Sequence, residues 1–138
     1  MIIEKDFVPY NEALALKELE FDEPCIQQYS YDGAIMFCVN SWGQPRFKTN
    51  KESLSDSGGD CISAPTFSQA FRFFREKYDL QYTITWNKHY SKNPYQWEVR
   101  KSWRDEPIIP YGIGGMSETY EQAELECLRK LIELCKSK

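Results

Sequence analysis

Histidine is the scarcest chemically versatile residue in this 138-residue chain, because His89 is the only one. A nucleophilic side chain needs a neighbouring base, which is most often histidine, and a third group that orients the base. His89 lies in a polar stretch, and the chain contains neither HExxH nor any other clustered metal-binding motif. We therefore expect a non-catalytic protein without a metal or cofactor. An enzyme that uses one cysteine is the least favoured alternative.

Long apolar runs are also missing, and no charged-then-apolar segment opens the chain. A membrane-spanning helix needs about 20 apolar residues in a row, and a secretory signal peptide needs such an opening segment. The five cysteines are odd in number, widely spaced and without a CxxC pair, which does not indicate a disulfide framework. These absences predict a cytoplasmic protein with free thiols at Cys25, Cys38, Cys61, Cys127 and Cys135.

The residue patterns that are present predict a single domain spanning residues 1–138. Apolar residues at helical spacing indicate three helices, and alternating or continuous apolar runs indicate two hairpins, the first of which turns at Asp32-Gly33. The predicted helices span 10–19, 67–78 and 120–135, and the predicted strands span 25–31, 34–39, 82–87 and 95–100. The order α-ββ-α-ββ-α predicts an α+β fold in which helices cover antiparallel strands. It also raises the hypothesis of two duplicated ββα units.

Three details refine this prediction. The run 34–39 is apolar throughout, which is typical of a central strand covered on both faces, or of a strand covered on one face by a partner. Residues 40–64 are predicted to be a mobile insertion, with an ordered binding loop as the alternative. Residues 106–117 are predicted to be a flexible crossover, with anion binding at 112–115 as the alternative.

A short pattern recurs at the start of each predicted helix, in residues 9–13, 66–70 and 119–123. In the last two copies a threonine precedes a glutamine by three residues. This spacing predicts a capping box, in which the two side chains satisfy backbone N–H groups at the helix start.

Three segments that include these helices resemble a family of small uncharacterised proteins from gut bacteria of the Bacteroides type and from their phages. The segments are 12–25 (EALALKELEFDEPC), 64–78 (APTFSQAFRFFREKY) and 119–133 (TYEQAELECLRKLIE). The resemblance implies a cytoplasmic, phage-related protein encoded by a mobile element. It implies no activity, and therefore no functional residues.

Basic residues concentrate in the middle of the chain. Residues 72–104 contain eight basic and three acidic residues, a net charge of +5, although the whole chain carries −4. Aromatic rings interleave with these cations, as in proteins that bind single-stranded nucleic acid. Strand alternation, however, places Trp86, Tyr95 and Trp97 on the face expected beneath the helices. The residues left for nucleic-acid contact are Lys88, His89, Tyr90, Lys92, Arg100, Lys101, Trp103 and Arg104.

The leading hypothesis from the sequence is a protein-interaction or accessory protein that forms a dimer or binds a protein partner. Phe73 widens the apolar stripe of the helix 67–78, and the strand 34–39 is entirely apolar. Surplus apolar surface of this kind marks interfaces. Nucleic-acid binding through the basic aromatic hairpin 82–104 is the alternative.

Overall fold

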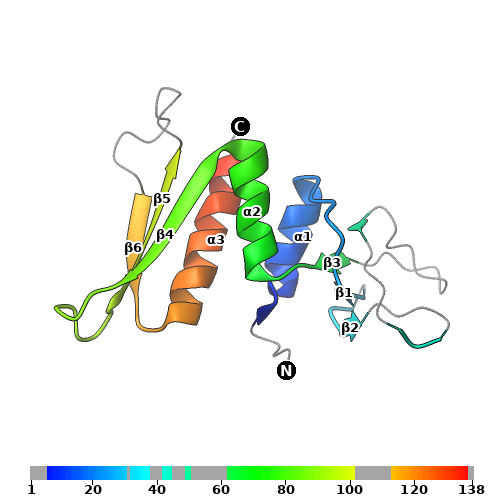
Figure 1. The fold of residues 1–138 in the computed structure, drawn as a ribbon, viewed down its shortest axis with the longest axis horizontal. Coiled ribbons are helices and arrows are strands. Elements are labelled where there is room, and N and C mark those ends of the chain that lie inside the picture. Colours follow the sequence, from blue (N-terminus) through cyan, green and yellow to red (C-terminus); the bar gives the residue numbers. More distant parts are fainter. Residues whose placement is uncertain are drawn as a thin grey trace. The chain divides into compact units, whose positions relative to one another are not determined.

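The computed structural model describes residues 6–30, 32–37, 42–44, 49–50, 62–101 and 113–136 (Figure 1). The chain forms two compact units, Met1–Ala70 and Phe71–Lys138. Within the described residues, no helix is long and apolar enough to cross a membrane.

In the part of the chain that the structure describes, three helices and two antiparallel sheets confirm the predicted α+β class and the alternation of helices with groups of strands. Each sheet has a third strand that the sequence patterns did not predict, β3 at the end of the expected insertion and β6 within the expected crossover. The elements are α1 (Tyr10–Glu18), β1 (Gln27–Tyr29), β2 (Ile35–Phe37), β3 (Ile62–Ala64), α2 (Phe67–Tyr78), β4 (Leu80–Trp86), β5 (Tyr95–Lys101), β6 (Ile113–Ser117) and α3 (Tyr120–Lys136).

The first unit is built around a sheet with the strand order β2-β1-β3. α1 packs against β3 and buries Ala13 and Leu16. Tyr29 of β1 lies against the N-terminal segment, where its hydroxyl donates a 2.7 Å hydrogen bond to the carbonyl oxygen of Val8. The predicted turn at Asp32-Gly33 is confirmed in position, with Gly33 at a φ of +87°, a conformation that glycine adopts without strain. It is longer than the two-residue turn that the dipeptide indicates, because the Ser30 N–H donates to the Ala34 carbonyl oxygen and Tyr29 pairs with Ile35.

Among the described strands, β2 lies at the edge of this sheet, so the prediction of a central strand covered on both faces is wrong for residues 34–37, and residues 38 and 39 lie outside the described part. β1 is the central strand, and its buried pattern includes two glutamines, Gln27 and Gln28. All three residues of β2 are exposed. The all-apolar run at 34–39 indicated burial. The more polar strand, β1, is central instead, because it pairs with both β2 and β3.

The capping box of α2 is confirmed. The Gln69 backbone N–H donates to the Thr66 hydroxyl at 3.2 Å, and the Thr66 N–H donates to the Gln69 side-chain oxygen at 3.0 Å. The Gln69 amide nitrogen also donates to the Pro24 carbonyl oxygen at 2.9 Å. At α3 only half of the predicted box forms, because the Gln122 N–H donates to the Thr119 hydroxyl while the Gln122 side chain turns to Glu126.

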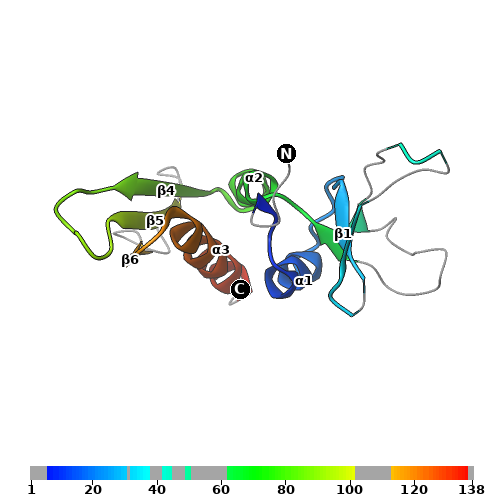
Figure 2. The same ribbon diagram turned by 90° about the horizontal axis from the view of Figure 1, so that it is seen from below.

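The second unit is a three-stranded meander with the order β4-β5-β6, and α3 lies along one face of it (Figure 1 and Figure 2). α2 passes into β4 through one residue, Asp79, whose φ of +57° ends the helix. Phe71 of α2 is buried and stacks on Tyr82 of β4, with the ring centroids 3.9 Å apart.

The two sheets share an order along the chain but not a strand arrangement. In the first sheet the central strand is β1, the first of its three strands along the chain. In the second sheet the central strand is β5, the second of its three strands. The two halves proposed as duplicated ββα units therefore share the order of strands and helix along the chain, but their sheets have different strand orders.

Candidate functional site

Alternate residues of the second sheet face α3, as strand periodicity requires. The indole Nε1 of Trp97 donates to Glu126 Oε2 of α3 at 3.1 Å, and the ring of Tyr95 meets that of Tyr120 edge to face at 6.0 Å. Val99 is fully buried. Trp86, at the end of β4, is 62% exposed, so only two of the three rings expected on this face are largely covered.

Two glycines allow β6 to approach β5 closely. A Cβ atom on Gly115 would lie 2.8 Å from Nε1 of Trp97, and one on Gly114 would lie 2.6 Å from the Trp97 carbonyl oxygen. Both distances are shorter than any normal contact. These glycines belong to a strand rather than to a helix start, so the predicted flexible crossover is wrong at 113–117 and the anion-binding alternative has no helix terminus there.

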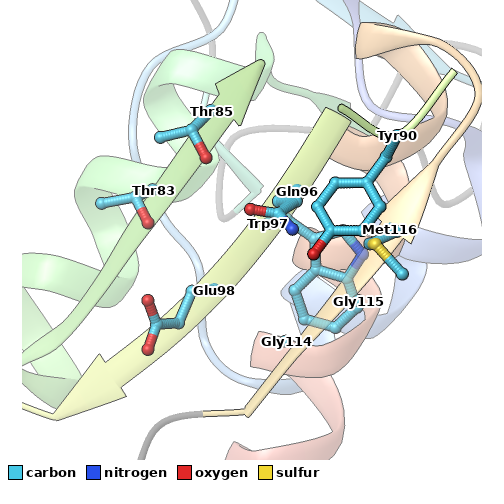
Figure 3. Close-up of a pocket in the computed structure, with 9 residues that line it drawn as sticks. All are labelled: Thr83, Thr85, Tyr90, Gln96, Trp97, Glu98, Gly114, Gly115 and Met116. Atoms are coloured by element: carbon cyan, nitrogen blue, oxygen red, sulfur yellow. The ribbon is translucent and has the colours of Figure 1, made fainter. Parts of the chain in front are cut away.

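The opposite face of this sheet is open and carries a shallow hollow of about 520 Å³ (Figure 3). Side chains from all three strands and from the β4–β5 loop meet around it. Tyr90 and Met116 lie on one side of the hollow, and Thr83, Thr85 and Glu98 lie on the other. The lining residues are Thr83, Thr85, Tyr90, Gln96, Trp97, Glu98, Gly114, Gly115 and Met116. We refer to this surface as the open face.

The open face is polar but almost uncharged. Glu98 is its only carboxylate among the lining residues, and it accepts a 2.7 Å hydrogen bond from Nε of Arg100, which neutralises it. Thr83, Thr85 and Gln96 present hydroxyl and amide groups toward solvent. Such groups can both donate and accept hydrogen bonds, so the face suits a ligand with mixed polar edges.

The residues predicted to contact nucleic acid separate into two groups. Lys88, His89, Tyr90 and Lys92 lie together in the exposed β4–β5 loop, where the Tyr90 N–H donates to the Asn87 carbonyl oxygen at 3.2 Å.

The second group lies at the far end of the hairpin. Arg100 pairs with Gln81 and Lys101 pairs with Leu80. Five residues of strand, about 17 Å, separate Arg100 from Tyr95 at the loop end. Lys101 also points to the α3 side of the sheet, by alternation. Trp103 and Arg104 lie outside the described residues.

Sequence reasoning missed Gln96, Thr83, Thr85 and Met116 as candidate site residues. The signal for the first three was present, because the alternation of β4 and β5 already separated an aromatic face from a polar one. Met116 could not be assigned without β6, which carries two glycines and lacks a strand pattern.

Glu126 ties α3 to two strands. Its carboxylate accepts hydrogen bonds from Trp97 of β5 and Ser117 of β6, and also from Gln122 of its own helix. Burial opposes the charged form, but these hydrogen bonds and the nearby charge of Arg129 outweigh it, so the pKa of Glu126 lies below its ordinary value.

Replacing Glu126 with alanine is expected to lower the free energy of unfolding by about 1–2 kcal/mol at pH 7, because it leaves the Trp97 and Ser117 donors without an acceptor. A lowered folded-state pKa means that the stabilisation is complete above the unfolded value of about 4.5 and is lost as the pH falls through the folded value. The difference in the free energy of unfolding between wild type and variant, measured by urea unfolding, should therefore shrink below about pH 4.5.

Glu133→Ala is the control for Glu126→Ala. Glu133 forms a surface pair with Lys130, so its replacement should change stability by less than about 0.5 kcal/mol. A constant difference down to pH 3 would contradict this role.

Cysteine and metal chemistry finds little support in the described part of the chain. Cys25, Cys127 and Cys135 are free and buried, and no group of three or more potential metal ligands occurs there. Burial, followed by the charge of Glu124, raises the pKa of Cys127 to about 12. Such a thiol is a poor nucleophile. Cys38 and Cys61 lie outside the described residues.

Apolar surface is found in one of the two places where the sequence indicated it. Phe73 is only 7% exposed and packs edge to face against Phe74 and Tyr78, so the expectation of exposed surface at Phe73 is wrong. Its ring widens the buried stripe of α2 instead. In β2, by contrast, Phe37 is 57% exposed, with Ile35 at 38% and Met36 at 40%.

Comparison with protein-family models, with curated proteins and with solved structures finds no match to this chain.

Proposed function

We propose that the protein is a non-catalytic interaction protein that forms a homodimer through β2. The observation that supports this proposal is the exposure of three consecutive apolar residues, Ile35, Met36 and Phe37, on β2, which lies at the edge of the sheet formed by the described strands. Single exposed apolar residues are common, but a contiguous group on an edge strand is an aggregation hazard unless something covers it.

The sequence of β2 is chemically self-complementary. If two copies pair antiparallel about a two-fold axis at Met36, Ile35 of one copy lies opposite Phe37 of the other. A β-branched residue opposite an aromatic one is a favourable cross-strand pair, and a two-fold axis gives a closed assembly. Because β2 has only three residues, we expect a weak dimer, with a dissociation constant on the order of 10 µM.

The test is sedimentation equilibrium of the full chain across the micromolar range. Met36→Glu would place two carboxylates opposite each other at the axis, where like charges are destabilising. We expect this variant to dissociate at least about tenfold more readily than the wild type, with a melting temperature that is nearly unchanged because Met36 is exposed.

Trp86→Glu is the matched control, because it also replaces an exposed apolar residue of a strand with a carboxylate, but in the second sheet. It should leave the dimer intact. A wild-type chain that stays monomeric at every concentration, or equal weakening by both substitutions, would refute association through β2.

The cellular setting that we propose is the cytoplasm. Buried free cysteines are typical of a reducing compartment. The resemblance of the helical segments to proteins of Bacteroides-type bacteria and their phages supports an accessory role in a mobile element.

Nucleic-acid binding by the β4–β5 hairpin is a second candidate function, favoured by one specific observation. Lys88 and Lys92 are exposed in the same loop as Tyr90, whose side chain is 46% exposed. Cations next to accessible rings are the features that bind single strands. Fluorescence anisotropy with labelled oligonucleotides should show binding at low salt that weakens steeply as salt rises. No binding at low salt, or binding that salt does not change, would contradict it.

A further inference from the structure

We infer that the open face of the second sheet is the surface on which a single strand of nucleic acid lies, with a base stacked on Tyr90 and base edges directed to Gln96 and Glu98. This inference rests on the second candidate function above. It adds a face of the sheet, a set of base-contacting residues and a base preference, none of which follows from the positive charge of the hairpin alone.

The aromatic contact comes from the β4–β5 loop. Two backbone hydrogen bonds shape this loop, from the Tyr90 N–H to the Asn87 carbonyl oxygen and from the Asn87 N–H to the Pro94 carbonyl oxygen. The loop brings Tyr90 to the rim of the hollow, across from Thr83 and Thr85 (Figure 3). Stacking on an aromatic ring is a contact that any base can make.

The polar groups of the hollow suit the edges of bases. Gln96 carries an amide, which can pair with the amino and ring nitrogens of adenine, and Glu98 carries a carboxylate, which can accept from the amino group of cytosine. Within the described residues, the side chains of Gln96, Thr83 and Thr85 form no hydrogen bond, so they are available to a ligand. These groups predict a preference for bases that carry an exocyclic amino group.

The charges around the open face fit a phosphate backbone that crosses it. Lys88 and Lys92 are exposed at the loop end, and Arg100 is exposed at the other end, about 17 Å along the strand from Tyr95. Arg100 also neutralises Glu98, the one carboxylate of the hollow. Phosphates can therefore lie near the two lysines at the loop end, while the bases face the uncharged centre, where the Arg100–Glu98 pair has no net charge.

The opposite face of the sheet has exposed rings but the wrong charge. Trp86 and Tyr120 are exposed on the α3 side, where Glu118 and Glu121 are exposed at the start of the helix. Burial, and next the negative charge of Glu124, raise the pKa of Tyr120, which agrees with an acidic environment. Phosphates are repelled there, so the open face is the favoured side.

The experiment measures fluorescence anisotropy of labelled dA12, dC12 and dT12 with the full chain at low salt. We expect dA12 and dC12 to bind several-fold more tightly than dT12, which lacks an exocyclic amino group. Tyr90→Ala should weaken binding of all three by about tenfold, and Tyr90→Phe should restore it because the ring remains. Gln96→Ala should weaken dA12 more than dT12.

Two control substitutions change side chains on the α3 side of the sheet and so test whether binding depends on the open face. Tyr120→Ala removes an exposed ring on the α3 side, and Lys101→Glu reverses a charge that alternation directs away from the open face. The same assay is repeated with these variants and with Tyr90→Ala at moderate salt, where long-range charge effects are screened, and each control should change binding by less than about twofold.

The outcomes are distinct. If Lys88→Glu weakens binding but Tyr90→Ala and Gln96→Ala do not, nucleic-acid binding stands and the open-face inference is overturned. Equal affinity for the three oligonucleotides overturns the base-edge contacts. No binding of any oligonucleotide at low salt overturns the candidate function itself.

Discussion

Replacing Phe71 with alanine is expected to lower the free energy of unfolding by about 3–5 kcal/mol. Phe71 is 1% exposed, and its ring lies almost parallel to that of Tyr82, with an interplanar angle of 16°. The substitution removes both the buried apolar area and the stacking partner, and it leaves a cavity that the surrounding elements can fill only in part. Since a domain of this size has a total stability of about 5–15 kcal/mol, this single substitution should remove a large fraction of the free energy of unfolding.

Urea unfolding followed by circular dichroism measures this effect. Phe71→Leu is the graded variant, and it should cost about 1–1.5 kcal/mol because most of the apolar volume remains. Glu76→Ala replaces an exposed residue of the same helix and should change stability by less than about 0.5 kcal/mol. A loss below 1 kcal/mol for Phe71→Ala would show that α2 does not pack on β4 through this ring.

The second large effect concerns thiol reactivity. At neutral pH, the folded protein should react at Cys127 with a thiol reagent at least about tenfold more slowly than the unfolded chain does, because the fall in thiolate fraction outweighs the higher nucleophilicity of a thiolate with a raised pKa. Its pKa of about 12, against an ordinary value of 9.0, corresponds to three tenfold reductions in the thiolate fraction. Burial of the sulfur, which is 0% exposed, slows the reaction further.

Mass spectrometry of tryptic peptides resolves this reaction, because Arg129 and Lys130 separate Cys127 from Cys135. Labelling in denaturant provides the reference rate for each peptide. Rapid labelling of Cys127 in the folded state would revive the hypothesis of an enzyme with a cysteine nucleophile. If labelling is slow, none of the three cysteines in the described residues is a suitable nucleophile, because Cys25 and Cys135 are also buried.

The sequence predicted the fold best where the pattern was local. Helical spacing and capping residues are set by neighbours in the chain, and α2, α3 and the capping box at Thr66 and Gln69 agree with the prediction. β3 and β6 were missed because three residues give too short a pattern and because paired glycines have low strand propensity. Both strands form because a partner strand is already present, which is a long-range effect.

The candidate site shows the same limit. Alternation in β4 and β5 predicted which side chains share a face, and Trp97 and Val99 lie toward α3 as expected. The pairing register, which the sequence does not reveal, separates the loop lysines from Arg100. The strand order, which the sequence does not reveal either, places β2 at an edge of the described sheet, although its apolar run had indicated a buried strand.

The boundary between the two units falls after Ala70, inside α2. This has a consequence for any attempt to express the units as fragments. A fragment that begins at Phe71 lacks the Thr66 and Gln69 cap and places its main aromatic anchor at a fraying helix end. A fragment that ends at Ala70 retains the cap but not enough helix to propagate from it. Gene truncations should therefore keep residues 66–78 in both halves, as a shared segment, for either half to be soluble.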